Sequence, residues 1–223
     1  MIQSFPRKRD LRQRGGHGVR GCDGQRDERS SMSKGRIEAF SDGVIAILIT
    51  IMVLELRPPA GADLAALQPL VPIFLSYVLS FVFLGIYWNN HHHLFQAVQQ
   101  VNGRVLWTNL HLLFWLSLIP FVTAWMGENN FAAGPVALYG VVLLLAACAY
   151  FLLVRSLLAL HGNDSMLAVA LGSDLKGKIS IVIYAAAIPV AFILPLLACA
   201  LYVLVAVIWF IPDRRIERVI RER

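Results

Sequence analysis

Ionisable and amide side chains fall inside segments of this chain that are otherwise apolar. Asp42 lies in the first such segment, His91–His93 near the end of the second, and Asn109 and His111 in the third. An acid beside imidazoles can sense or relay protons, and imidazole also binds metals. Amides and hydroxyls supply hydrogen bonds between membrane helices. Polar groups at membrane depth need partners, so these residues are expected to meet.

Three roles for these residues are compatible with the sequence. A structural hydrogen-bond network that locks helix to helix is favoured, and a proton-sensing or gating network comes second. A metal site built on His91–His93 comes last, because consecutive helical residues point about 100° apart and share no face. We therefore expect no metal. The sequence has no HExxH, CxxC or GxSxG motif, so we also expect no enzyme and no cofactor.

The composition shows which elements must position these residues. Hydrophobic residues make up 57% of the chain and charged residues only 15%, which is too apolar for a soluble domain. The chain is therefore expected to be an all-α, polytopic membrane protein. Its three cysteines form no recognisable framework, and we expect no disulfide.

The apolar segments predict six transmembrane helices. The first starts near Lys34, with Ser33 as its cap. The last apolar run, 179–211, would make a helix of about 50 Å, well beyond a hydrocarbon core of about 30 Å. It should therefore be two helices that reverse at Phe192–Pro195. The spans are expected over about 34–56, 72–95, 104–126 and 134–154 and in the two halves of 179–211.

Three regions follow from this pattern. Residues 1–33 mix Arg, Gly, Asp and Ser with little to bury, which predicts a disordered basic leader, and Met32 is an equally plausible start. Residues 34–212 form the six-helix membrane domain. Residues 213–223 form a basic cytoplasmic tail.

The net charge of +6 is explained by topology. With the N-terminus inside, all of the 20 Lys and Arg residues except Arg57 fall on the inner side of the six-span arrangement. This bias predicts that both termini are cytoplasmic. The positive charge then serves orientation and contact with anionic lipid in the bilayer, and nucleic acid is not an expected partner.

In this topology the polar residues share one depth in the cytoplasmic half of the membrane. They are expected to form one layer that joins the first three helices. Its members are Arg36, Ser41, Asp42, Asn89, Asn90, His91, His92, His93, Asn109 and His111.

An aliphatic stripe follows the polar start of the first helix. Ile47, Ile51 and Leu54 recur at i, i+4 and i+7, with Thr50 one step around the helix. From periodicity alone, a lipid-facing or packing surface is favoured over a pore.

The string RIEAFSD, with Arg36 and Phe40–Asp42, closely resembles the first-helix signature of the transmembrane protein 175 family, the lysosomal potassium channels and their bacterial homologues. WNNHHHLF at the end of the second span and NLHLLFWLSLIPF in the third agree with it. The resemblance covers about Lys34–Pro212 and leaves out the leader.

This resemblance implies a potassium-selective channel in the plasma membrane of a bacterium. It implies a homotetramer in which the first helix of each chain lines a pore that conducts K⁺ passively. Aliphatic residues would constrict the pore, and a threonine would contribute selectivity. The matching positions are Ile47, Ile51 and Leu54 for the constriction, Thr50 for selectivity, and Arg36, Phe40, Ser41 and Asp42 for contacts with neighbouring helices.

Two alternatives come from other classes of protein. One is a proton-coupled secondary transporter that uses Asp42 and the membrane histidines as a relay. The other is a membrane scaffold without transport, in which the polar layer serves packing alone.

Overall fold

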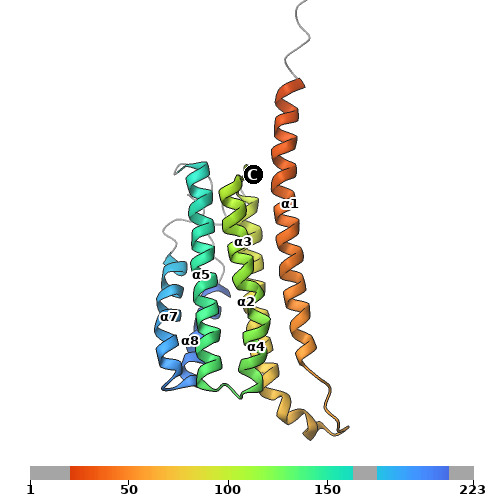
Figure 1. Ribbon diagram of the computed structural model, residues 1–223, viewed down its shortest axis with the longest axis vertical. Coiled ribbons are helices and arrows are strands. Elements are labelled where there is room, and N and C mark those ends of the chain that lie inside the picture. The colour runs from red at the N-terminus through yellow and green to blue at the C-terminus, as the bar shows by residue number, and fades with distance from the viewer. Residues whose placement is uncertain (1–20, 163–174, 211–223) are drawn as a thin grey trace, which may run out of the picture.

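The computed structural model describes residues 21–162 and 175–210, with side chains from Lys34 onward. One long helix stands beside a bundle of the others (Figure 1). The described elements are all helical: α1 (Gly21–Ile51), the 3₁₀ helices η1 (Met52–Glu55) and η2 (Leu64–Leu70), α2 (Val71–Gln96), α3 (Gly103–Ser117), α4 (Ile119–Glu128), α5 (Ala133–His161), α7 (Leu175–Ala191) and α8 (Pro195–Phe210).

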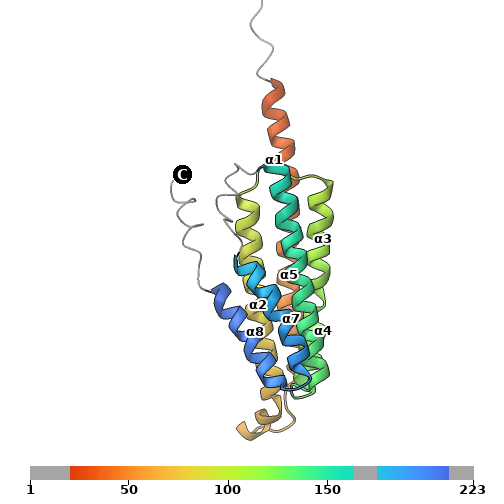
Figure 2. The same cartoon turned by 90° about the vertical axis from the view of Figure 1, so that its left-hand side faces the viewer.

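The predicted six-helix organisation is confirmed. Four helical segments are long and apolar enough to cross a membrane: Lys34–Glu55, Leu64–Gln96, Gly103–Glu128 and Ala133–His161. The last apolar run is two shorter helices, α7 and α8, which lie side by side (Figure 2). The chain reverses between Ala191 and Pro195, where the sequence predicted the turn.

The predicted start of the first helix was wrong. α1 begins at Gly21 and runs without interruption through Ser33, which was expected to cap it. No proline interrupts this stretch, and extending an existing helix costs far less than nucleating a new one. Of the leader predicted to be disordered, 21–33 is therefore helical, and 1–20 lies outside the described residues. The basic tail, 213–223, also lies outside them.

Two local features set helix ends within the bundle. Asn102 caps α3, because its Oδ1 accepts a hydrogen bond from the Val105 backbone N–H at 3.0 Å. α5 ends at Gly162, whose φ of +83° lies in the left-handed region that favours glycine. The Gly162 N–H donates to the Leu158 carbonyl at 2.9 Å, which closes the last turn.

The third predicted span is one membrane crossing made of two helices. α3 ends at Ser117, and α4 begins at Ile119 with Pro120 in its first turn. Proline lacks the N–H that would continue the hydrogen-bond ladder and clashes with the preceding turn. Pro120 therefore explains why this crossing is divided at Leu118.

α5 forms the centre of the bundle and packs against α3, α4, α7 and α8. Buried hydroxyls join the helices within this apolar core. The Ser80 Oγ on α2 lies 2.6 Å from the Thr123 Oγ1 on α4 and 3.0 Å from the Tyr139 hydroxyl on α5. Such bonds contribute roughly 1 kcal/mol in membranes, so shape complementarity carries much of the packing.

The crossing of α2 and α4 depends on Gly127. A Cβ at this position would lie 2.7 Å from the Ile73 Cα, which is backbone and cannot move aside. The Gly127→Ala substitution should destabilise the protein by about 1–3 kcal/mol through overpacking. The measurement is thermal unfolding of the purified protein in detergent.

Gly85→Ala is the matched control, because a Cβ there has no neighbour within 4 Å. Its helix-interior position predicts a neutral effect or a gain of up to about 1 kcal/mol. Equal melting temperatures for the two variants would contradict the close approach at Gly127.

Candidate functional site on the first helix

α1 is held by one face only. The buried residues of this face recur every three or four positions and pack toward α2, α3 and α4. A helix with such a stripe is anchored on one side and leaves the opposite side without partners inside the chain. The buried residues of α1 are Ile37, Ser41, Ile45 and Leu48, and Met52 continues the stripe on η1.

The opposite face of α1 and η1 carries the predicted constriction residues. Ile47 is 56% exposed, Ile51 42% and Leu54 72%, although all three are large and apolar. Thr50 is exposed on the same side. The stripe found by periodicity is therefore the part of the helix that is left exposed by the described residues of its own chain.

Thr50 has a defined side-chain orientation. Its hydroxyl donates a hydrogen bond to the Ile47 carbonyl at 2.9 Å, one turn earlier. A hydroxyl has one donor and two acceptor lone pairs. Because the donor is used within the helix, the lone pairs of Oγ1 stay available to a cation.

A buried chain of hydrogen bonds joins α1, α3 and α2 on the N-terminal side of this stripe along α1. The Asn109 Nδ2 donates to the Ser41 Oγ at 2.9 Å, and the Asn109 Oδ1 lies 2.8 Å from the His91 Nε2. Since the Asn109 oxygen is an acceptor, His91 donates from Nε2. All three side chains are buried, and the His91 ring stacks on Phe95 with centroids 4.5 Å apart.

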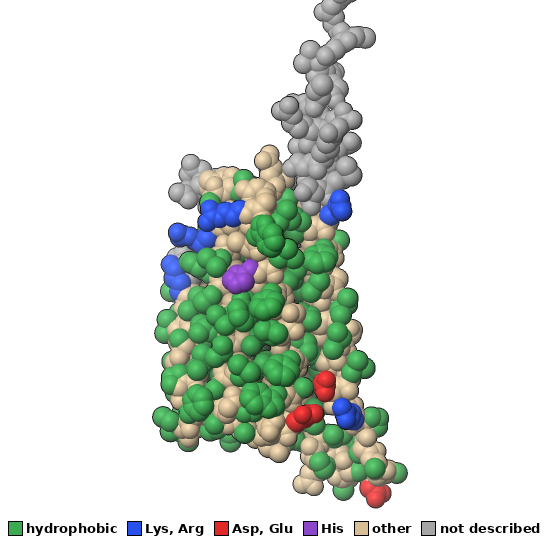
Figure 3. All heavy atoms as spheres, in the orientation of Figure 1, with side chains coloured by type: hydrophobic (Ala, Val, Ile, Leu, Met, Phe, Trp, Pro, Cys, Tyr) green, Lys and Arg blue, Asp and Glu red, His purple; other side chains and the backbone are tan. Residues whose placement is uncertain are grey.

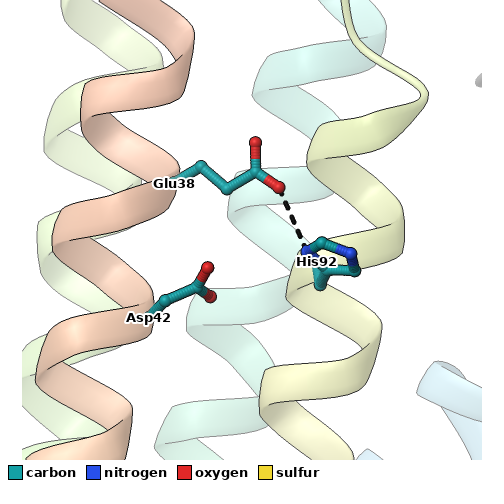
Figure 4. A group of neighbouring side chains, drawn as sticks. All are labelled: Glu38, Asp42 and His92. Carbon is teal, nitrogen blue, oxygen red and sulfur yellow. Dashed lines mark ion pairs between the residues drawn. The ribbon is translucent and has the colours of Figure 1, made fainter.

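A second polar group lies beside this chain and contains Glu38, Asp42 and His92 (Figure 4). The His92 Nδ1 lies 3.1 Å from the Glu38 Oε1, close enough for an ion pair but not aligned as a hydrogen bond. Glu38 was not among the residues that the sequence predicted for the layer. Its separation of four residues from Asp42, which puts both on one helix face, was the signal that could have done so.

His111 lies outside the polar layer. It is exposed on α3, and its Nε2 accepts a hydrogen bond from the Trp115 indole N–H at 2.8 Å. Residues two apart on a helix point about 200° apart, so His111 and Asn109 cannot face the same neighbours. Asn109 takes the inward position.

The other predicted members of the layer are placed at its margin. Arg36 and Phe40 are exposed on α1, on the side away from the buried stripe. His93 is half-buried, with its ring 5.9 Å from that of His92. Asn89 is exposed, while the Asn90 amide donates to the Ile86 carbonyl within α2. The structure thus joins Ser41, Asn109 and His91 directly and sets His92 against Asp42 and Glu38.

The fold and site define a polytopic, all-helical membrane protein whose first helix presents an unpaired aliphatic face above a polar layer. Comparison with known proteins then gives its family. The family model described as the endosomal/lysosomal potassium channel TMEM175 matches residues 36–120, which include the second half of α1, all of α2 and α3, and the polar layer. The chain belongs to the TMEM175 family.

Similar proteins extend over most of the chain. The potassium channel HX13_20290 of Chryseobacterium sp. strain P1-3 is 54% identical over 191 residues, covering 86% of this chain and 100% of that protein. The crystal structure of a lysosomal potassium-selective channel TMEM175 homolog from Chamaesiphon minutus matches with a TM-score of 0.69 at 27% identity, covering 80% of this chain and 96% of that one. The human endosomal/lysosomal proton channel TMEM175 is 32% identical over 121 residues, 49% of this chain and 24% of that protein.

The buried hydrogen-bond chain can be tested by truncating its central member. Asn109→Ala leaves the Ser41 hydroxyl and the His91 ring without their partner, at a cost of about 1–3 kcal/mol for unsatisfied buried groups. We expect a lower melting temperature in detergent and weaker attachment of α1. Faster hydrogen exchange of α1 amides would report the second effect.

Asn89→Ala removes the same side chain from an exposed position on α2 and serves as the control. It should leave both measurements unchanged. If Asn109→Ala were as stable as the wild type, the hydrogen bonds of Asn109 with Ser41 and His91 would not stabilise the fold as proposed.

Proposed function

We propose that this protein is a potassium channel that conducts K⁺ passively through a pore lined by α1. The single observation that carries the proposal is the aliphatic face of α1 and η1, where Ile47, Ile51 and Leu54 are exposed in the described part of the chain. The names of the Chryseobacterium and Chamaesiphon relatives, both potassium channels, support it.

The pore would be built by four copies of the chain. Each chain has one Arg-x-x-x-Phe-Ser-Asp string and one α1, so a central pore requires several copies around an axis. The homotetramer is the arrangement that the family resemblance implies. In it the exposed stripe of α1 would be covered by the same stripe of its neighbours, and the buried stripe would hold each α1 to its own bundle.

The gate would be a dewetted constriction. The sequence contains no TVGYG string of the kind whose carbonyls replace the hydration shell of K⁺. Rings of isoleucine and leucine instead exclude water when narrow and admit hydrated ions when the helices separate. Ile47 would form the tightest ring, with Ile51 one turn farther along α1 and Leu54 about two turns farther, on η1.

Thr50 would supply selectivity. Its hydroxyl proton is donated to the Ile47 carbonyl, so its lone pairs would be available to ions on the exposed side of α1. Four such hydroxyls would form a polar ring within the apolar stretch. Partial coordination of this kind supports a modest preference for K⁺ over Na⁺.

The protein would sit in the plasma membrane of a bacterium with both termini in the cytoplasm. Figure 3 shows most of the visible Lys and Arg toward one end of the face in view, with acidic groups and a basic side chain toward the other end. Arg104 and Arg155 lie near the start of α3 and the end of α5, which point to the same side, and Arg36 lies midway along α1, before its aliphatic stripe. Arg57 follows η1 at the opposite end. Positive residues concentrate on cytoplasmic segments, which supports this orientation.

The gate can be tested by making its narrowest ring polar. Ile47→Asn should ease hydration of the constriction and raise basal K⁺ flux in liposomes by about tenfold or more, the change produced by lowering a barrier by 1.4 kcal/mol. Val182→Asn makes the same kind of change at an exposed position on α7 and should leave flux unchanged.

Unchanged flux in Ile47→Asn would count against a pore along α1. Flux that saturates and requires an opposing proton gradient would favour the proton-coupled transporter. If neither the wild type nor Ile47→Asn gave K⁺ flux, in liposomes shown to contain folded tetramers, the result would favour the scaffold.

Selectivity can be tested by removing the hydroxyl of Thr50. Thr50→Val keeps the shape of the side chain and removes its lone pairs, so the permeability ratio of K⁺ to Na⁺ should fall toward 1. Ser117→Ala removes another exposed hydroxyl and should leave the ratio unchanged. Reversal potentials under bi-ionic conditions give the ratio, and an unaltered value in Thr50→Val would remove this residue from the selectivity mechanism.

A further inference from the structure

Three side chains with metal-ligand chemistry meet between α1 and α2. Glu38 and Asp42 lie one turn apart on α1, and His92 faces them from α2 (Figure 4). One ligand atom from each residue lies within 4.8 Å of the others. All three residues are partly buried, with side-chain exposures of 21% for Glu38 and 34% for His92.

Two polar atoms of this cluster lack hydrogen-bond partners. The Asp42 Oδ1 and the His92 Nδ1 are buried, and neither has a hydrogen-bond partner among the described residues. Buried polar atoms without partners are uncommon and need an explanation. The carboxylates of Glu38 and Asp42, four residues apart on one helix face, also repel each other. A cation held among the three would satisfy both atoms and remove the repulsion.

We propose that Glu38, Asp42 and His92 bind one divalent transition-metal ion, with Zn²⁺ the best match. Zinc takes imidazole nitrogen and carboxylate oxygen at about 2.0–2.2 Å, which separates neighbouring tetrahedral ligands by about 3.3 Å. The His92 Nδ1 and Glu38 Oε1 are already 3.1 Å apart, so the Asp42 carboxylate is the group that must move inward. Three protein ligands leave the fourth position for water.

The surroundings of His92 suit a metal ligand. Its Nε2 lies 2.7 Å from the Gln96 side-chain amide, one turn along α2. Turned by 180°, this amide presents its oxygen to an Nε2–H and leaves Nδ1 unprotonated toward the carboxylates. Metal-bound histidines characteristically donate their other ring N–H in this way. The Trp88 indole stacks on the ring with centroids 5.9 Å apart and fixes its plane.

The donor set selects the class of ion. Imidazole suits Zn²⁺ and neighbouring transition metals, whereas Ca²⁺ and Mg²⁺ prefer oxygen ligands alone, six or more in number. Two carboxylates and one imidazole therefore favour Zn²⁺ over the more abundant hard cations.

Bound metal would link α1 to α2. The ligands come from both helices, so the ion adds a bond beside the buried contacts of Ser41 with Asn109. A ligand that binds only the folded protein raises its stability by mass action. This inference does not depend on the proposed function, because binding can be measured in a protein that passes no ions.

The test is to measure Zn²⁺ binding to the purified full-length protein in detergent by isothermal titration calorimetry. We expect one ion per chain. Glu38→Gln and His92→Gln should each weaken binding by more than about tenfold, and Gln96→Ala by about tenfold through the loss of the supporting bond. Substituting Co²⁺ should give the visible absorption of a tetrahedral site in the wild type but not in Glu38→Gln.

His111→Gln is the matched control, since it removes an exposed imidazole from another helix. It should bind Zn²⁺ as the wild type does, and saturating Zn²⁺ should raise the melting temperature of both but not of Glu38→Gln. If His92→Gln fails to fold, Glu38→Gln and Gln96→Ala carry the test. Wild-type affinity in Glu38→Gln, equal loss in His111→Gln, or Mg²⁺ binding as tight as Zn²⁺ would overturn the inference.

Discussion

The attachment of α1 by a single buried stripe is the constraint on which the rest of this structure depends. In hydrocarbon, apolar surfaces gain little by packing on one another rather than on lipid, so hydrogen bonds and close fit must decide which face turns inward. The hydrogen bonds among Ser41, Asn109 and His91 do this for α1. A rotation of α1 that broke these bonds would leave three polar groups without partners in hydrocarbon. Because the face with Ser41 is held inward, the aliphatic face points away from the bundle.

This arrangement separates two tasks along one helix. The first turns after Lys34 carry the contacts to α2 and α3, while the turns from Ile47 onward carry a face that stays exposed among the described residues. A helix transmits a tilt or rotation at one end to the other, since its backbone bonds make it stiff over several turns. Movements of the polar residues on the N-terminal side are therefore mechanically connected to the aliphatic stripe.

The sequence predicts the spans well and the rotation of each span poorly. Proline and hydropathy located the reversal before Pro195, because the length of the apolar run and the proline within it are both visible in the sequence. Orientation is harder, since core-facing and lipid-facing residues of a membrane helix are equally apolar. The placement of His111 in the polar layer failed for this reason, and Glu38 was missed because its partner His92 belongs to another helix. The start of α1 at Gly21 was also missed, because the helix extends from the membrane span back into the polar leader, and the composition of the leader does not indicate this.

The overwound end of the first helix has a geometric consequence. Met52–Glu55 forms a 3₁₀ turn, which advances about 2.0 Å and 120° per residue, against about 1.5 Å and 100° for an α-helix. Relaxing these four residues to α geometry would shorten the segment by about 2 Å and swing Leu54 around the axis by about 60°. The segment that follows α1 thus contains a short torsional element, able to reorient a leucine without moving the bundle that holds the helix.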